Sequence, residues 1–198
     1  YKIIFQLVKF VVSKFRMNFT SFDVNLFEKL CESTDENENI FFSPLSISLA
    51  LSMLLLGSNG TTKQQIEEAL GFVKDEELLS KLKALNDVLN YDSNSLKVEL
   101  VNSVFPSETF IMDAKYKSDM KTAFKCQIQS LDYNNNADKS KNKINGWVAR
   151  CTNGKIEVLF KKLIPETVCV LVRCIYFKGD WFDKFKHYNT YKAPFYCT

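Results

Sequence analysis

The stretch VLVRCIYFKGDW, residues 170–181, decides the fold of this chain. The residues before it and up to Phe177 are almost continuously apolar, so we expect a strand from about Thr167 to Phe177 that is buried on both faces. Arg173 lies in the middle of this strand, and the run ends on a lysine, a glycine, an aspartate and a tryptophan. A charge inside a buried strand is costly unless it is paired, so Arg173 calls for an explanation.

The whole chain has the composition of one globular domain. Of its 198 residues, 46% are hydrophobic and 25% are charged, which is enough apolar material for a core. A chain of this length buries roughly 70% of its unfolded surface. The formal net charge of +3 is mild, and unopposed basic residues gather at the N-terminus, so no nucleic-acid partner is expected.

The cysteines favour free thiols over a metal site. None of the six lies in a CxxC pair, and the chain has a single histidine, His187, so no metal site is expected. Most of them fall within apolar runs, where cysteine acts as a small buried hydrophobe. The six are Cys31, Cys126, Cys151, Cys169, Cys174 and Cys197.

Residues 1–16, YKIIFQLVKFVVSKFR, resemble a targeting segment at first sight. Lys9 interrupts the apolar run, and no small-x-small cleavage site follows. The segment is also too short and too charged to span a bilayer, so a membrane partner is not expected. A basic helix on a membrane surface is one interpretation. We favour the other, in which Met17 is the true start and residues 1–16 are an extra segment outside the fold.

From Met17 onward, helices and strands are mixed without regular βαβ alternation, which predicts the α+β class. Ser43 is a good N-cap and Pro44 suits the first helical position. The helix that follows, through Leu56, is apolar almost all round and should lie inside the protein. We expect further helices at 19–30, 61–70, 75–90, 113–124 and 137–151, and strands at 39–42, 96–105 and 126–133.

No set of catalytic residues assembles along the sequence. GxSxG, HExxH, phosphate-loop and dinucleotide motifs are all missing, so we expect neither an enzyme nor a cofactor. A Ser-His-Asp triad would depend on His187, which lies in the polar stretch KFKHYNTY and is typical of a solvated loop. Asn18 and Asn59 begin glycosylation sequons, which matter only if the chain is secreted.

Several longer motifs resemble the serpins, a family of protease inhibitors. Residues 39–72, NIFFSPLSISLALSMLLLGSNGTTKQQIEEALGF, closely resemble the second and third serpin helices. Residues 142–156 are similar to the helix that lies across the main serpin sheet, and residues 170–181 to the strand that ends in FKG-x-W. APFY near the C-terminus fits as well. The order and spacing agree throughout, so residues 17–198 are identified as the N-terminal portion of a single serpin domain.

The resemblance implies a fold and an activity. The fold is the α+β serpin fold, truncated here before the reactive-centre loop, so the reactive bond is absent from this chain. The activity is suicide inhibition of serine or cysteine proteases, in which the target cleaves an exposed bait loop and the cut loop inserts as a strand into the central sheet. The partner would be a target protease, and its capture would need the missing C-terminal half.

The resemblance also implies a role for the strand predicted at 167–177. This strand would border the gap into which the cleaved loop inserts. Helices 44–56 and 137–151 would cover its two faces. Ser43 and Ser46 correspond to a polar cluster beneath the sheet that controls its opening, and Trp181 to the upper end of the gap. Arg173 stands where serpins usually carry asparagine. It would either weaken control of sheet opening or be a tolerated residue that reaches solvent.

Two other functions stay open beside the inhibitor. One is a non-inhibitory serpin that acts as a carrier or chaperone-like binding protein. The other is a truncated interaction module that pairs its open sheet edge with another chain. The family expectation for location is the extracellular space, whereas a start at Met17 and free cysteines suit the cytoplasm.

Overall fold

The computed structural model describes residues 20–35, 38–72, 77–92, 96–181 and 183–194. Its helices are α2 (Thr20–Ser33), α3 (Pro44–Leu56), α4 (Gly60–Leu70), α5 (Leu78–Leu89), α6 (Ala114–Phe124), α7 (Ala137–Cys151) and the short 3-10 helix η1 (His187–Asn189). Its strands are β1 (Tyr91–Asp92), β2 (Leu96–Pro106), β3 (Gln127–Ile128) and β4 (Cys169–Gly179). The N-terminal segment 1–16, Asn18 and Cys197 lie outside the described residues.

The strands form one mixed sheet built around β2. Strand β4 pairs with β2 antiparallel over its full length, from Leu96↔Gly179 to Pro106↔Cys169. The opposite edge of β2 pairs with β1 at one end and with β3, in parallel, near the other. Strand β4 therefore lies at a border of the sheet, with β2 as its one partner among the described strands.

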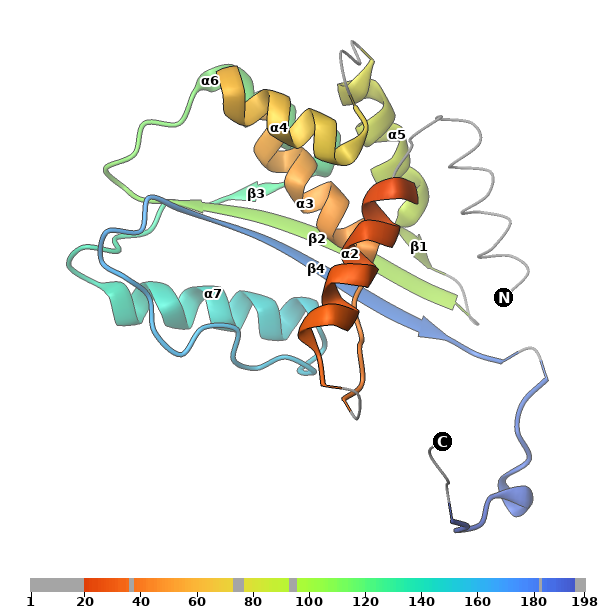
Figure 1. Cartoon of the computed structure of the whole chain (residues 1–198). Coiled ribbons are helices and arrows are strands. Elements are labelled where there is room, and N and C mark those ends of the chain that lie inside the picture. Colours follow the sequence, from red (N-terminus) through yellow and green to blue (C-terminus); the bar gives the residue numbers. More distant parts are fainter. Residues whose placement is uncertain (1–19, 36–37, 73–76, 93–95, 182, 195–198) are drawn as a thin grey trace.

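Helices cover both faces of this sheet, and each face has its own core (Figure 1). Helices α3, α4, α5 and α6 lie on one face, and α7 lies on the other. Alternate side chains of a strand point to opposite faces. Accordingly, Leu171 packs against the first core, while Val172 and Cys174 belong to the second, beside Ile144 and Trp147 of α7.

Helix α3 forms as its sequence predicts. Ser43 is its N-cap, with the hydroxyl oxygen accepting from the backbone N–H of Ser46, and Pro44 is its first residue. Leu49 and Met53 are fully buried, so the all-round apolar helix does lie inside the protein. It ends at Gly57, whose N–H bonds back to the carbonyls of the last turn.

Other boundaries differ from the sequence-based expectation. Helix α4 starts at Gly60 behind Asn59, one residue before the predicted start at Thr61. Residues 39–42 form no strand, and only Gln127–Ile128 of the predicted strand 126–133 are in a strand. A strand exists only beside a partner, which β propensity alone does not supply. Strand β4 itself runs two residues later than predicted at both ends.

Candidate functional site

The feature on which a function could depend is the edge of β4 that no described strand pairs with, called its free edge from here on. One face of this strand contacts the buried helix α3 and the other contacts α7. Residues 169–174 are buried or half-buried, as expected for a strand between two layers. Ile175 and Phe177 are 41% and 56% exposed, so burial on both faces stops halfway along the strand. Both alternate with Leu171 along the strand, so they point to the face of the sheet that α3 covers, and α3 leaves them open to solvent.

Arg173 is held from the neighbouring strand. Its guanidinium Nη1 donates to the side-chain oxygen of Asn102 at 2.7 Å, and the two residues face each other in the register of β2 and β4. The amide nitrogen of Asn102 in turn donates to the carbonyl of Phe124 at 2.7 Å. Asn102 is buried, so its amide connects the two strands to the end of α6 inside the protein.

The rest of the Arg173 guanidinium is not paired. Nε and Nη2 are both buried and have no hydrogen-bond partner among the described residues. None of the ion pairs between described residues includes this side chain. Burial lowers the pKa of the Arg173 guanidinium to about 10, because removing the charge from water disfavours the protonated form. Among the described residues, the bond to the Asn102 side-chain oxygen is therefore the one side-chain hydrogen bond that holds this cation.

Ser43 and Ser46 lie in the first turn of α3, the helix that contacts β4. The Ser43 hydroxyl oxygen accepts from the Ser46 backbone N–H at 3.4 Å. The Ser46 hydroxyl is buried without a partner among the described residues. Neither hydroxyl bonds to Arg173, so the structure does not join the predicted cluster through hydrogen bonds.

Sequence reasoning missed three polar side chains that have buried atoms. Asn102 is the partner of Arg173, and Asn86 of α5 is buried with both amide atoms unpaired by any described residue. Asp23 of α2 is the third, and burial raises the pKa of its carboxyl. A signal did exist for Asn102. It is a polar residue within the apolar strand LKVELVNSVF, as Arg173 is within its own strand.

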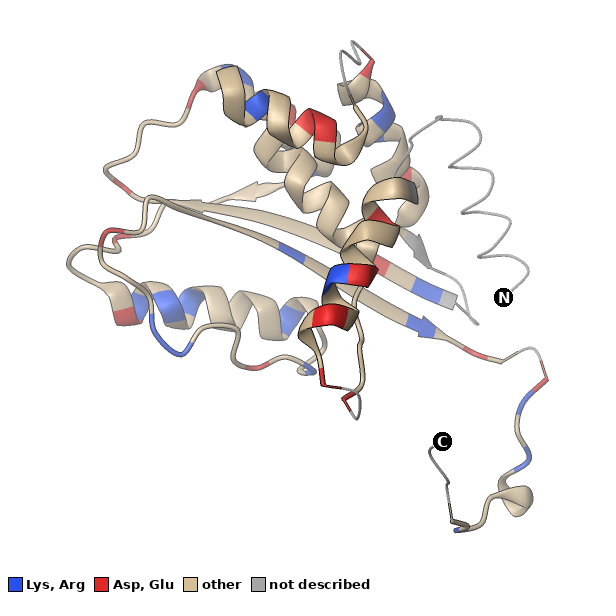
Figure 2. Cartoon of the chain, in the orientation of Figure 1, with Lys and Arg blue, Asp and Glu red and all other residues tan. Residues whose placement is uncertain are grey.

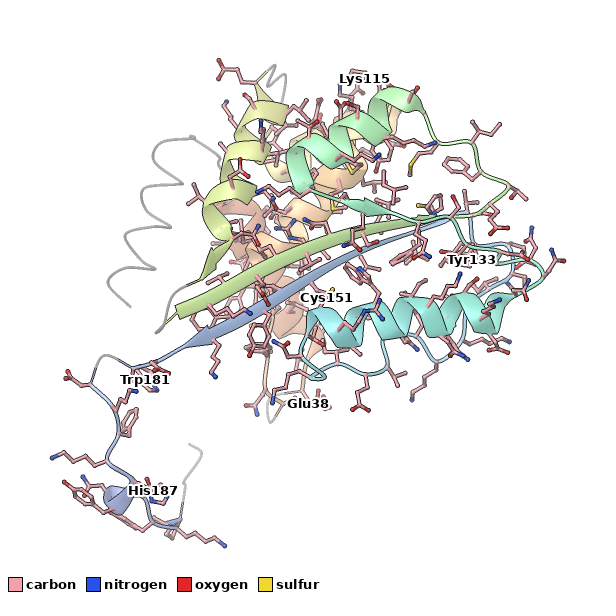
Figure 3. All side chains as sticks on the ribbon, turned by 180° about the vertical axis from the view of Figure 1, so that it is seen from behind. Glu38, Lys115, Tyr133, Cys151, Trp181 and His187 are labelled. Atoms are coloured by element: carbon pink, nitrogen blue, oxygen red, sulfur yellow. The ribbon has the colours of Figure 1, made fainter. Side chains whose placement is uncertain are left out.

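The remaining predicted residues lie apart from Arg173. Trp181 follows β4, roughly 26 Å along an extended chain from Arg173. It is 52% exposed and packs edge-to-face against Phe185 (Figure 3). His187 is exposed in η1, as predicted for a solvated residue. Asn59 is exposed at the start of α4, where its sequon is accessible.

Charges of both signs are spread over the described surface (Figure 2). Helix α7 differs, since after Asp138 it carries only basic residues among its charged ones. No group of metal-binding side chains occurs in the described ranges. The five cysteines within them form no disulfide with one another. No helix there is long and apolar enough to cross a membrane.

The arrangement defines a class of protein: an α+β domain with a long border strand between a buried helix and a covering helix. A family model described as Serpin (serine protease inhibitor) matches residues 17–198. The chain belongs to the serpin family. The resemblance of the sequence motifs and the α+β assignment are thereby confirmed.

Relatives and solved structures agree with this assignment. The chain is 38% identical to leukocyte elastase inhibitors of Xenopus tropicalis and Equus caballus, over 89% of its length and 47% of theirs. Emu ovalbumin matches with a TM-score of 0.82 and 30% identity, over 93% of this chain and 51% of that one. Reaction-loop-cleaved lamprey angiotensinogen matches with a TM-score of 0.81 and 26% identity, over 94% and 54%. The chain spans about half the length of the curated relatives it matches.

Proposed function

We propose that the whole protein inhibits serine or cysteine proteases by inserting a cleaved loop beside β4. The observation that carries this proposal is the free edge of β4, an 11-residue strand with α3 behind one face and α7 over the other. Backbone N–H and C=O groups along this edge have no ladder partner among the described strands. The names of the relatives support the same activity, because two of them are called leukocyte elastase inhibitor.

The chemistry would proceed in two stages. The nucleophile of the protease attacks the scissile carbonyl of the bait loop, the amine side of the peptide bond leaves, and an acyl-enzyme forms. The freed loop then adds to the edge of β4, and about every second residue of β4 gains a pair of backbone hydrogen bonds. Within this proposal, Ser43, Ser46 and Arg173 influence how readily the sheet accepts the strand, and Trp181 marks where insertion begins.

The test uses the full-length protein and leukocyte elastase. We expect an adduct that survives SDS and has the summed mass of the two proteins, together with a higher Tm of the loop-cleaved form. Elastase whose catalytic serine is replaced by alanine is the control, and it should form no adduct. The 198-residue chain alone should form none either. Clean cleavage without an adduct or a rise in Tm would contradict the inhibitor and favour the carrier-like alternative.

The glycosylation sequon that begins at Asn59, just before α4, tests where the protein is located. We propose the extracellular space, following the family expectation. The exposed Asn59 should then carry a glycan in protein isolated from its source, and peptide mass spectrometry detects it. An unmodified Asn59 in all of that protein would argue for the cytoplasm instead.

A further inference from the structure

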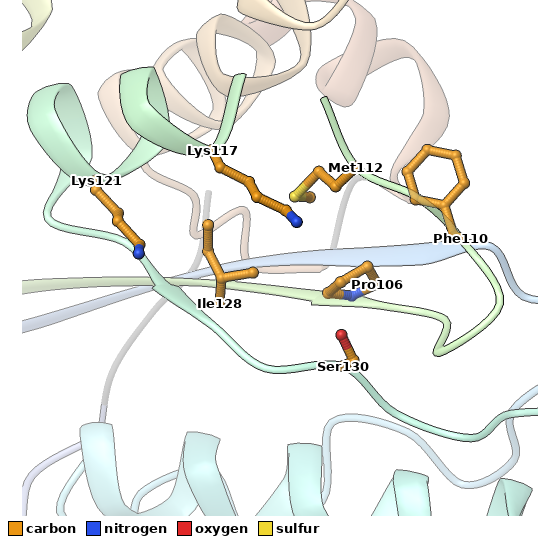
Figure 4. Close-up of a pocket in the computed structure, with 7 residues that line it drawn as sticks. All are labelled: Pro106, Phe110, Met112, Lys117, Lys121, Ile128 and Ser130. Atoms are coloured by element: carbon orange, nitrogen blue, oxygen red, sulfur yellow. The ribbon is translucent and has the colours of Figure 1, made fainter. Parts of the chain in front are cut away.

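A small pocket lies between α6 and β3, away from the free edge of β4 (Figure 4). Its volume is about 270 Å³, just below the ~300–1,000 Å³ of typical small-molecule pockets. Pro106 and Ile128 line the side formed by the sheet, while Phe110 and Met112 come from the segment that leads into α6. These four apolar side chains form one part of the lining, and polar side chains form the rest, around a space that suits a small ligand.

Two lysines of α6 also line this pocket. Lys117 and Lys121 are four residues apart, so they lie on one face of the helix. Figure 4 shows both side chains extending from α6 toward the sheet. Neither forms an ion pair with a described residue, whereas Lys115 on the same helix pairs with Asp119 at 2.6 Å. The pocket therefore combines several apolar side chains with two cations that no described residue pairs.

This combination selects a class of ligand. Side chains four residues apart on a helix are ~5–6 Å apart at Cβ, so two flexible ammonium groups can approach the two oxygens of one carboxylate. The apolar lining would receive a ring or a short alkyl chain, and the Ser130 hydroxyl at the pocket is a further donor or acceptor. We propose that this pocket binds a small monocarboxylate with an apolar body.

The pocket remains available when the sheet gains a strand. Strand β3 pairs with one edge of β2, and β4 pairs with the other. A strand added to the free edge of β4 would be separated from β3 by both β2 and β4. Ligand binding here is therefore independent of the inhibitory function, and the two proposals can fail separately.

The experiment follows Met112 in full-length protein that carries ¹³C-labelled methionine methyl groups. Met112 lines the pocket, whereas Met53 of α3 is fully buried in the same core without lining the pocket and serves as an internal reference. The variant Met112→Leu assigns the signal. Benzoate should shift the Met112 signal saturably and leave that of Met53 in place. Benzamide, which has the same shape without the charge, and acetate, which lacks the ring, should produce much smaller shifts.

Paired lysine variants test the proposed contacts. In Lys117→Gln/Lys121→Gln, we expect benzoate to bind about 3- to 10-fold more weakly, as for the loss of two partly exposed charge contacts. The matched control is Lys139→Gln/Lys143→Gln, which removes two exposed lysines at the same spacing on α7, outside the pocket. Its benzoate affinity should stay unchanged. Equal affinities for benzoate and benzamide, or equal losses in both variants, would overturn the proposal.

Discussion

Arg173 and Asn102 face each other across β4 and β2, joined by a hydrogen bond of 2.7 Å that Asn102 accepts. The same Asn102 amide donates to the carbonyl of Phe124. The buried side chain of Asn102 thus bonds both to the backbone at the end of α6 and to the guanidinium of Arg173 in β4. Because Nε and Nη2 of Arg173 have no described partner, the centre of the sheet contains buried donors that a smaller residue would not introduce.

Replacing Arg173 by asparagine should raise the Tm of the full-length, uncleaved protein. The change removes two buried unpaired donor nitrogens, each of which costs about 1–3 kcal/mol, and keeps an amide that can bond to Asn102. Differential scanning calorimetry measures the effect. Lys178→Asn, at an exposed position of the same strand, is the control and should leave Tm nearly unchanged. An unchanged or lower Tm of Arg173→Asn would count against this account.

Replacing Asn102 by alanine should lower the free energy of unfolding by about 2–4 kcal/mol. The Phe124 carbonyl would lose its donor, and Arg173 would keep its charge without any described partner. Urea denaturation gives the value. Asn142→Ala, at an exposed position on α7, should change stability far less.

The two substitutions should also be coupled. In the double variant Asn102→Ala/Arg173→Asn, the buried cation is gone. The change Asn102→Ala should therefore lower the free energy of unfolding by less in the Arg173→Asn protein than in the parent protein. A double-mutant cycle in urea measures this coupling. Strict additivity would show that the 2.7 Å contact contributes nothing to stability.

Alkaline pH should destabilise the fold through its buried thiols. Burial raises the pKa of Cys126 from 9.0 to about 12. The unfolded chain releases this proton first, so the stabilisation is complete below pH 9 and is lost as pH rises toward 12. Unfolding in urea under reducing conditions, at several pH values from 8 upward, should show this decline.

Cys126→Ala should flatten that pH dependence, because the buried group no longer titrates. Cys31→Ala is the matched control, since Cys31 is an exposed thiol, and its pH profile should follow that of the parent protein. If the parent protein, Cys126→Ala and Cys31→Ala lose stability identically as pH rises, Cys126 does not contribute to the pH dependence.

The 198-residue chain expressed alone should aggregate through the free edge of β4. Ile175 and Phe177 are exposed there, beside unpaired backbone groups that can template another chain. Ile175→Lys/Phe177→Lys should increase the soluble fraction after centrifugation. Val158→Lys/Ile164→Lys places the same charges at exposed apolar positions away from the strand and should help less. An equal increase in the soluble fraction of both double variants would mean that exposed apolar residues in general, and not the edge of β4, cause the aggregation.

Much of the helical framework could be predicted because its signals are local. The cap at Ser43, the proline after it and the all-round apolar character of residues 45–56 specify α3 without reference to the rest of the chain. The apolar run around Arg173 likewise predicted β4 to within two residues. Resemblance of longer motifs then supplied the family, which the comparisons show.

Pairing and burial were decided only by the tertiary structure. Residues 39–42 have the sequence of a strand and form none, whereas Gln127 and Ile128 form one because β2 lies beside them. The partner of Arg173 is 71 positions away, and the pocket of α6 combines residues from three separate segments. The sequence by itself determined which segments are helical, apolar or charged, since capping and periodicity act over a few residues. Which edge stays free, and which buried donors lack partners, depends on contacts between distant residues that only the folded chain creates.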